Sequence, residues 1–170
     1  MAAAGVSKPT LYAHFGSKEG LLAAVLKRRH AARAASLQAW VDAASPNPRA
    51  RLLAVFDWLG EFYLTDGARG CAFLNAAAET PDVDDPARIA AREHKQWTRE
   101  YLAELAAAAG LADAERLGSQ LLLLIDGASA RMVVDGGTDG EGVLAGEIAG
   151  QAREVAEILI AAHSSGAGAA

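Results

Sequence analysis

The side chains best suited to bind another molecule gather close to the start of the chain. Ammonium, hydroxyl, phenol and imidazole groups follow one another there, and each can bond a phosphate oxygen or the edge of a base. Val6, Leu11 and Phe15 are spaced by five and four residues, so they share the opposite side of a helix. The segment therefore predicts a short helix that buries its apolar side and presents its polar side to nucleic acid. The polar residues of this set are Ser7, Lys8, Thr10, Tyr12, His14 and Lys18.

The net charge of −5 is divided unevenly along the chain. Residues 1–36 carry six cations and one anion, whereas the remaining 134 residues carry ten cations and twenty anions. A basic end on an acidic body indicates a polyanion partner that binds at that end only. A basic helix surface that contacts only water is the alternative, and charge alone does not separate the two.

Three helices are expected to position the polar residues. Residues 1–4 have the character of the last turn of a helix, and residues 5–6 form a tight turn. A short helix follows over residues 8–14, and Ser17 caps a long helix that ends near Ala44. Two helices joined by a tight turn form a helix-turn-helix, whose second helix enters the major groove of DNA.

Helical spacing continues through the rest of the chain. In the next expected helix, residues 49–65, apolar side chains recur at Leu52, Phe56, Leu59 and Tyr63. Hydrophobic residues make up 52% of the chain, and Ala, which dominates them, favours helix because it loses no side-chain entropy there. No strand pattern and no internal repeat occurs, so the predicted fold class is all-α. Four more helices are expected over residues 73–79, 86–109, 114–134 and 141–162, before a disordered tail at 164–170.

Several classes of protein are excluded by what the sequence lacks. A single cysteine, Cys71, leaves no intramolecular disulfide. No apolar run approaches the roughly 18 residues that span a membrane, and the N-terminus lacks the pattern of a signal peptide, so a cytoplasmic protein is expected. There is no Ser/His/Asp arrangement, no nucleotide-binding loop and no recognisable pair of carboxylates. We therefore predict no enzyme activity, no cofactor and no metal site.

The stretch from Ala2 to Leu22 resembles the DNA-binding signature of the TetR (tetracycline repressor) family. The shared pattern is Gly-Val-Ser, a short recognition helix with Leu-Tyr and His-Phe, and then Ser-Lys-x-x-Leu. The resemblance implies that Ser7, Lys8 and Thr10 face bases, and that the other three polar residues hold phosphates. It also implies that the core of this domain includes Val6, Leu11, Phe15, Leu21 and Leu22.

Members of this family carry about one and a half further helices before the position of Ala2, and those helices form much of a small three-helix core. Without them, Leu11, Phe15 and Leu22 would each lose burial worth about 1.5–3 kcal/mol. The sequence from Met1 is therefore expected to be a shortened form of an ordinary regulator, the product of a misplaced start codon, or a variant with weak DNA binding.

The expected domains are an incomplete helix-turn-helix domain with the start of a linker helix over residues 1–36, and a helical-bundle ligand-binding and dimerisation domain over residues 37–163. The resemblance implies that the last two long helices pair with their copies in a homodimer. Residues 121–125 are apolar all round one helix and need cover on more than one side, although burial within one subunit is the alternative. The expected interface residues are Leu117, Leu121, Ile125, Ala128, Met132, Ile148, Val155 and Leu159.

Aromatic residues mixed with a few polar ones in the central helices point to a ligand site. An apolar cavity with a few polar anchors is how proteins hold small molecules, although each aromatic residue on its own can be core. Asp126 lies inside the apolar run, where an unpaired carboxylate would be costly, and Arg131 is the partner that the sequence offers. The candidates are Trp58, Phe62, Tyr63, Phe73, Asn75, His94, Trp97, Tyr101 and Asp126.

Together these patterns predict a ligand-responsive DNA-binding transcriptional regulator. In this hypothesis a homodimer represses from a palindromic operator, and a small apolar effector releases it by binding the released state better. The alternative is a dimeric small-molecule-binding module that has lost DNA binding through its missing N-terminal helices. A steep loss of DNA affinity with rising salt is expected of the regulator only.

Overall fold

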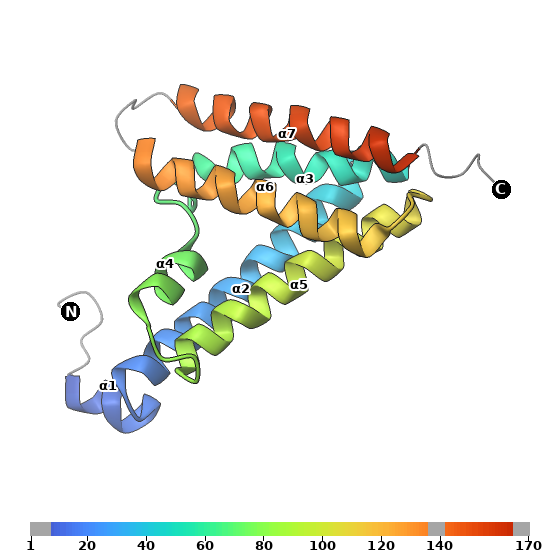
Figure 1. The fold of residues 1–170 in the computed structure, drawn as a ribbon. Helices are drawn as coiled ribbons and strands as arrows, with labels where there is room; N and C mark the ends of the chain where they lie inside the picture. Colours follow the sequence, from blue (N-terminus) through green and yellow to red (C-terminus); the bar gives the residue numbers. More distant parts are fainter. Residues whose placement is uncertain (1–7, 136–141, 165–170) are drawn as a thin grey trace. The chain divides into compact units, whose positions relative to one another are not determined.

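The computed structural model describes residues 8–135 and 142–164 of the chain. Within these ranges it contains seven α-helices and no strand, which confirms the all-α prediction (Figure 1). The predicted turn at residues 5–6, the expected loop after Asp135 and the tail after Ser164 lie outside the described residues. The helices are α1 (Lys8–Phe15), α2 (Lys18–Ala44), α3 (Pro48–Tyr63), α4 (Ala72–Glu79), α5 (Pro86–Ala108), α6 (Ala114–Asp135) and α7 (Val143–Ser164).

Local capping explains where the helices begin. The Ser17 hydroxyl accepts a hydrogen bond of 3.0 Å from the backbone N–H of Gly20 at the start of α2. At α3 the Asn47 side chain accepts from the N–H groups of Arg49 and Ala50, at 2.9 and 3.3 Å. Pro48 then occupies the first turn, where its missing N–H leaves no partner unsatisfied.

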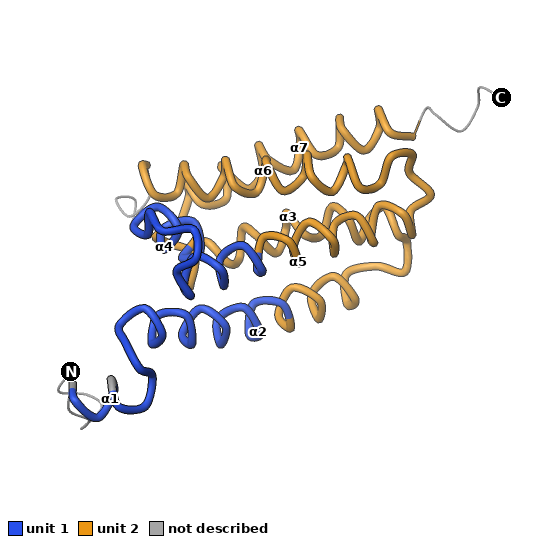
Figure 2. Tube along the Cα trace, turned by 60° about the horizontal axis from the view of Figure 1, so that its bottom comes forward, with its two compact units in different colours: residues 1–34, 72–94 blue, residues 35–71, 95–170 orange. Residues whose placement is uncertain are grey.

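Contacts divide the chain into two compact units (Figure 2). Unit 1 consists of residues 1–34 and 72–94, and unit 2 of residues 35–71 and 95–170. The end of the first segment of unit 1 lies close to the predicted domain boundary after residue 36. Unit 1, however, also contains α4 and the start of α5, which the sequence placed in the body. Packing between segments that are distant in the chain cannot be predicted from local sequence patterns.

In unit 1, the loop between α4 and α5 is fastened to α5. The Arg88 guanidinium donates to the carbonyl oxygens of Thr80 and Pro81, at 2.8 and 3.1 Å. The Arg92 guanidinium donates to the carbonyl of Val83 at 2.9 Å. These hydrogen bonds satisfy backbone carbonyl groups that have no helical partner in the irregular loop.

In unit 2, α3, α6 and α7 pack against one another around an apolar core. Leu52, Phe56 and Leu59 are buried on α3, at the helical spacing that the sequence shows. Leu121 of α6 and Ile148 of α7 are also almost completely buried. Burial of each such side chain contributes about 1.5–3 kcal/mol, so this packing is the main source of stability in unit 2.

Two glycines of unit 2 permit close approaches to α6. A Cβ atom at Gly118 would lie 2.8 Å from the backbone nitrogen of Ala103 and from the carbonyl oxygen of Arg99, both in α5. Gly70 has a φ of +72°, and a Cβ there would lie 2.6 Å from the carbonyl oxygen of Ser129. Both positions therefore need the residue without a side chain.

Helix α6 is long and apolar enough to cross a membrane by length and composition alone. Its Leu117 and Leu121 lie in the core of unit 2, and its Asp126 forms an ion pair with Lys95 of α5. Apolar helices that form the core of a folded unit pass the same test, so length and composition alone do not assign α6 to a membrane.

Candidate nucleic-acid interface and ligand site

The structure describes the side chains of three of the six polar residues that the sequence singled out. Thr10 and His14 on α1 are exposed, and so is Lys18 at the start of α2. Leu11 and Phe15 are half-buried on the same short helix. The contact of Thr10, His14 and Lys18 with DNA stays a prediction. Of the other predicted DNA-binding residues, Ser7 lies outside the described residues, and Lys8 and Tyr12 are described as parts of α1 without their side chains.

The junction between α1 and α2 is fixed by local bonds. Gly16 has a φ of +77°, which lets the chain turn sharply between the two helices. The Glu19 backbone N–H, the Ser17 hydroxyl and the neighbouring Lys18 hold the pKa of the Glu19 carboxyl below its ordinary value. The first turn of α2 thus already has its own anion and cap, and the Lys18 side chain beside them is exposed.

The cations of unit 1 stay largely on the surface. Lys27, Arg28 and Arg29 are exposed along α2, as is Lys18. Arg33 is half-buried, and its guanidinium carbon lies 5.4 Å from the centre of the Phe73 ring. The charge asymmetry of the sequence therefore appears as exposed positive charge on α2.

The predicted ligand residues fall into both units. Phe73, Asn75 and His94 belong to unit 1, and the other six belong to unit 2. In unit 1, the buried His94 ring stacks on Phe73, with 3.7 Å between ring centres, whereas Asn75 is exposed. The Nδ1 atoms of His94 and His30 lie 3.0 Å apart, so His94 has a hydrogen-bond partner within unit 1.

The aromatic residues of unit 2 form two stacked pairs. The rings of Trp58 and Phe62 lie 5.1 Å apart, and those of Trp97 and Tyr101 lie 5.3 Å apart. The Trp58 indole donates to the Ser36 hydroxyl at 3.1 Å. Such stacked pairs contribute stability beyond their burial alone.

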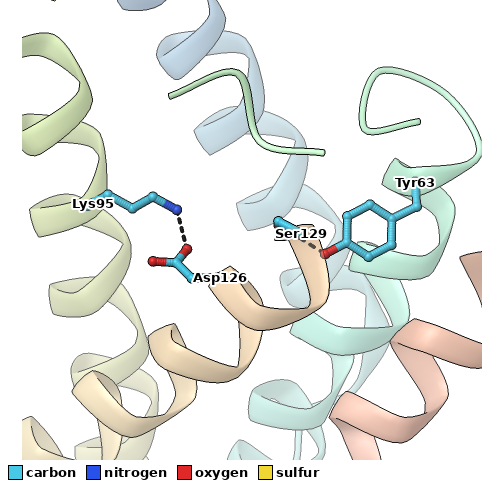
Figure 3. A network of polar contacts seen from close by, with 4 residues as sticks. All are labelled: Tyr63, Lys95, Asp126 and Ser129. Carbon is cyan, nitrogen blue, oxygen red and sulfur yellow. Dashed lines mark hydrogen bonds and ion pairs between the residues drawn. The ribbon is translucent and has the colours of Figure 1, made fainter. Parts of the chain in front are cut away.

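Asp126 pairs with Lys95 of α5, and not with Arg131 as the sequence suggested (Figure 3). The side chains of Lys95 and Asp126 are only 20% and 27% exposed. Arg131 instead binds Asp135 at 3.2 Å and the Gln151 side chain at 2.8 Å. The i+5 spacing from Asp126 turns Arg131 away from the side of α6 that faces α5.

A second polar contact lies one turn along α6 from Asp126. The Ser129 and Tyr63 hydroxyls are buried and lie 3.0 Å apart (Figure 3). Sequence reasoning selected Tyr63 as an aromatic residue but missed Ser129, because a serine within a helix gives no signal of its own. Asp126 and Ser129 therefore place a charged and a neutral polar group on neighbouring turns of α6.

Tyr101 carries a buried polar group of unit 2. It is 8% exposed, and its hydroxyl has no hydrogen-bond partner among the described residues. Burial raises the pKa of this hydroxyl above its ordinary value, the carboxylates of Asp42 and Glu104 raise it further, and Arg51 opposes them. The hydroxyl therefore stays protonated at neutral pH, as a buried donor available to a bound molecule.

Comparison with known proteins places this arrangement in a family. Residues 1–25 match the family model of the bacterial regulatory proteins, tetR family. The chain is similar to the crystal structure of a TetR-family transcriptional regulator from Streptomyces coelicolor, with a TM-score of 0.81. That protein is 31% identical, over 96% of this chain and 82% of the other. The chain belongs to the TetR family.

A second TetR structure, from Streptomyces avermitilis, has a TM-score of 0.74 and 30% identity, over 96% of this chain and 84% of the other. No curated protein matches the chain in sequence. Membership of the TetR family confirms that the chain is a helix-turn-helix DNA-binding transcriptional regulator and not an enzyme.

The predicted dimer residues of this TetR chain divide by burial. Five of the eight are buried within the chain itself, and their contact with a second copy stays a prediction. Val155 is exposed, and Ile125 and Leu159 are half-buried. The five covered residues are Leu117, Leu121, Ala128, Met132 and Ile148.

Large apolar residues remain exposed on α6 and α7. Leu123 is 71% exposed and Val134 is 81% exposed on α6, and Ile158 is 68% exposed on α7. Together with Val155 we call these residues the α6/α7 apolar face. Helices α6 and α7, which carry these residues, pack against each other.

Two open hollows on unit 2 are separate from the predicted ligand residues. The first has a volume of about 370 Å³ and the second about 320 Å³, and no predicted ligand residue lines either. Arg99, Glu100, Ala103, Glu104, Glu115 and Ser119 line the first, and Trp40, Phe56, Asp57, Gly60, Glu61, Gly146, Ala149, Gly150 and Arg153 line the second.

Proposed function

We propose that the chain is a homodimeric, ligand-responsive repressor that binds a palindromic operator through α1 and the start of α2. The observation that supports it most strongly is the exposed polar side of α1 in a TetR chain. Thr10 and His14 lie on that side, and Lys18 is the first residue of α2, whose start is capped by Ser17. The helix-turn-helix arrangement uses such a side to contact bases and phosphates.

The α6/α7 apolar face supports dimerisation. Monomeric proteins rarely expose large neighbouring apolar side chains, and such patches commonly mark contacts with another protein. A second copy covers the face of the first in an isologous dimer, because the same residues meet on both sides of a two-fold axis. A palindromic operator has the same symmetry, so two copies bind its two half-sites.

The residues in the interior of unit 2 support the proposal that the effector is a small, mainly apolar molecule. The stacked aromatic pairs of unit 2 supply apolar contact, and the Tyr101 hydroxyl is a buried donor that no described residue uses. Asp126 and Ser129 are further polar groups on the same unit. An effector that binds the released state more tightly shifts the population away from the DNA-bound state. A regulator of this kind acts in the cytoplasm, where its operator is.

The test is a binding titration with duplex DNA from upstream of the chain's own gene. We expect the chain to bind one site in this DNA as two copies, as measured by native mass spectrometry. His14→Ala is expected to weaken binding about tenfold by removing a contact to DNA. Arg49→Ala, which removes an exposed cation from unit 2, serves as the control and is expected to bind like the wild type.

Two results would contradict the proposal. A wild-type dimer that binds no site in this DNA at low salt would favour the alternative, a small-molecule-binding module without DNA binding. Equal weakening by His14→Ala and Arg49→Ala would show that binding depends on total charge and not on α1.

A further inference from the structure

Two histidines that the proposed function does not use meet in unit 1. His30 lies on α2 and His94 on α5, and their Nδ1 atoms are 3.0 Å apart. The two rings are inclined at 75°, with 5.2 Å between their centres. His94 is 4% exposed, and Phe73 of α4 covers one face of its ring. The pair thus joins three helices of unit 1 at one point.

The hydrogen bond between two imidazole nitrogens depends on how many protons the pair carries. A neutral imidazole has one N–H donor and one acceptor nitrogen, whereas a protonated imidazole has two donors and no acceptor. When both rings are neutral, one Nδ1 donates to the other. One added proton keeps this bond and makes it charge-assisted. A second added proton leaves two N–H donors and two positive charges facing each other at contact distance.

The charged residues around the pair add to this repulsion. One turn from His30 on α2 stand Lys27 and Arg33, both cations, and Arg33 lies over the Phe73 ring. On α4 the positions one turn from Phe73 hold Ala76 and Ala77, so they carry no charge. On α5 the positions one turn from His94 are also uncharged; they hold Ala90, Ala91, Trp97 and Thr98.

Two acidic side chains stand elsewhere on these elements. Glu93 precedes His94 and is exposed, and Glu79 ends α4 and is also exposed. Exposed carboxylates are screened by water and stabilise a buried positive charge only weakly. The two charged residues that lie one turn from the pair on its own helices, Lys27 and Arg33, are both positive, while the adjacent Glu93 is exposed to water.

We propose that His30 and His94 form a proton-sensitive latch. With no more than one added proton the latch fastens α2 to α5 and α4 within unit 1, and with two it opens. The second proton must enter a pair that already carries one positive charge, so acidification opens the latch only after the first proton has bound. Because α2 follows directly on α1, opening loosens the helix that carries the DNA-contacting end. That consequence for operator binding rests on the proposed function, whereas the latch itself does not.

The test follows the latch without using DNA. Hydrogen exchange of the amides in α4 and in residues 86–94 is measured at about pH 7.5 and about pH 5.5, each corrected for the intrinsic rate. We expect protection in the wild type to fall about tenfold at the lower pH. His30→Gln keeps a side chain that can donate and accept but cannot be protonated, so its protection is expected to change less than about twofold.

His163→Gln is the matched control, because His163 lies on α7 in unit 2 and contacts the Leu159 carbonyl. It is expected to show the full wild-type fall in α4. In the wild type, ¹⁵N shifts of the two imidazoles are expected to show proton uptake by the pair in two separate steps. Independent single-step uptake by each ring, or an equal fall in His30→Gln and the wild type, would overturn the latch. If His30→Gln does not fold, the imidazole titration of the wild type decides alone.

Discussion

At the scale of single residues, Asp126 and Asp135 allow the value of an ion pair to be compared at two degrees of burial. Both lie on α6 and pair with a cation, Asp126 with the mostly buried Lys95 and Asp135 with the half-exposed Arg131. Asp126→Asn removes the anion and leaves the Lys95 ammonium in a poorly solvated site. We expect the free energy of unfolding to fall by about 1–2 kcal/mol, as measured by urea denaturation.

Asp135→Asn is the matched control, since it removes an exposed i, i+4 pair and is expected to change stability by less than about 0.5 kcal/mol. Equal losses in the two variants would show that the contact between Lys95 and Asp126 has no special role in unit 2.

Tyr101 provides a prediction with a pH dependence. The pKa of its hydroxyl is raised in the folded state, so the folded protein binds this proton more tightly than the unfolded chain does. The resulting contribution to the free energy of unfolding is complete below the ordinary pKa of 10.0. As pH rises past 10.0, the unfolded chain loses the proton first and the folded state loses stability. Tyr101→Phe is expected to lose less stability than the wild type in urea denaturation between about pH 9 and pH 11.

At neutral pH, Tyr101→Phe is expected to be as stable as the wild type, because the hydroxyl that it removes has no partner among the described residues. A loss of more than about 1 kcal/mol at neutral pH would mean that the hydroxyl is bonded in the protein.

Residue patterns predicted the exposed side of α1 but not the partners of the buried polar groups. The sequence assigned Thr10, His14 and Lys18 to a polar surface, because spacing along one short helix is a local property. Asp126 and Lys95 are separated by 31 positions, and His30 and His94 by 64. Such pairs depend on how helices pack, and no local pattern encodes that.

At the scale of helices, Gly118 sets how closely α6 approaches α5. Gly118→Ala would place a methyl group 2.8 Å from two backbone atoms of α5, so the helices must move apart. We expect a loss of about 1–3 kcal/mol in the free energy of unfolding, measured by chemical denaturation.

Gly146→Ala, on α7, is the control, because a Cβ atom there meets nothing within 4 Å. It is expected to raise stability by about 0.5–1 kcal/mol, since alanine favours a helix over glycine. A stabilising Gly118→Ala would mean that α5 and α6 do not pack as closely as the structure shows.

Most helix ends could be predicted, because their signals are local. Ser17 caps α2 as expected, and Gly110 follows α5 with a φ of +68°, as a residue after a helix end commonly does. Asp113, the residue before α6, has a φ of +49°, and its carbonyl accepts the N–H of Leu117 at 2.9 Å. The grouping of α4 with the start of α2 could not be predicted, since the two segments are distant in sequence.

At the scale of the whole molecule, the rotation of α6 and α7 decides which apolar residues can reach a second copy. The sequence shows five consecutive apolar residues from Leu121 to Ile125 but not which of them face the core. The structure turns Leu121 inward and leaves Leu123 exposed. Five of the predicted interface residues are therefore buried within the chain, while Leu123, Val134 and Ile158 are exposed apolar residues that the sequence pattern did not single out.

The α6/α7 apolar face gives a prediction for the dimer. Ile158→Glu places a charge at the centre of a contact that a second copy would cover, and a buried unpaired carboxylate is costly. We expect a monomer in sedimentation equilibrium with unchanged helix content. Val83→Glu, at an exposed apolar residue of unit 1, is the control and is expected to remain a dimer. A dimeric Ile158→Glu variant would place the interface elsewhere.

The measurement that tests the central claim most directly is the salt dependence of binding to DNA from upstream of the chain's own gene. Fluorescence anisotropy is recorded at several salt concentrations for the wild type, Lys18→Ala and the unit 2 control Arg49→Ala. A repressor that binds phosphates predicts a steep linear fall of log affinity with log salt, and a slope lower by about one in Lys18→Ala only. Affinity that does not change with salt, or that Lys18→Ala leaves unchanged, would contradict DNA recognition through α1 and the start of α2.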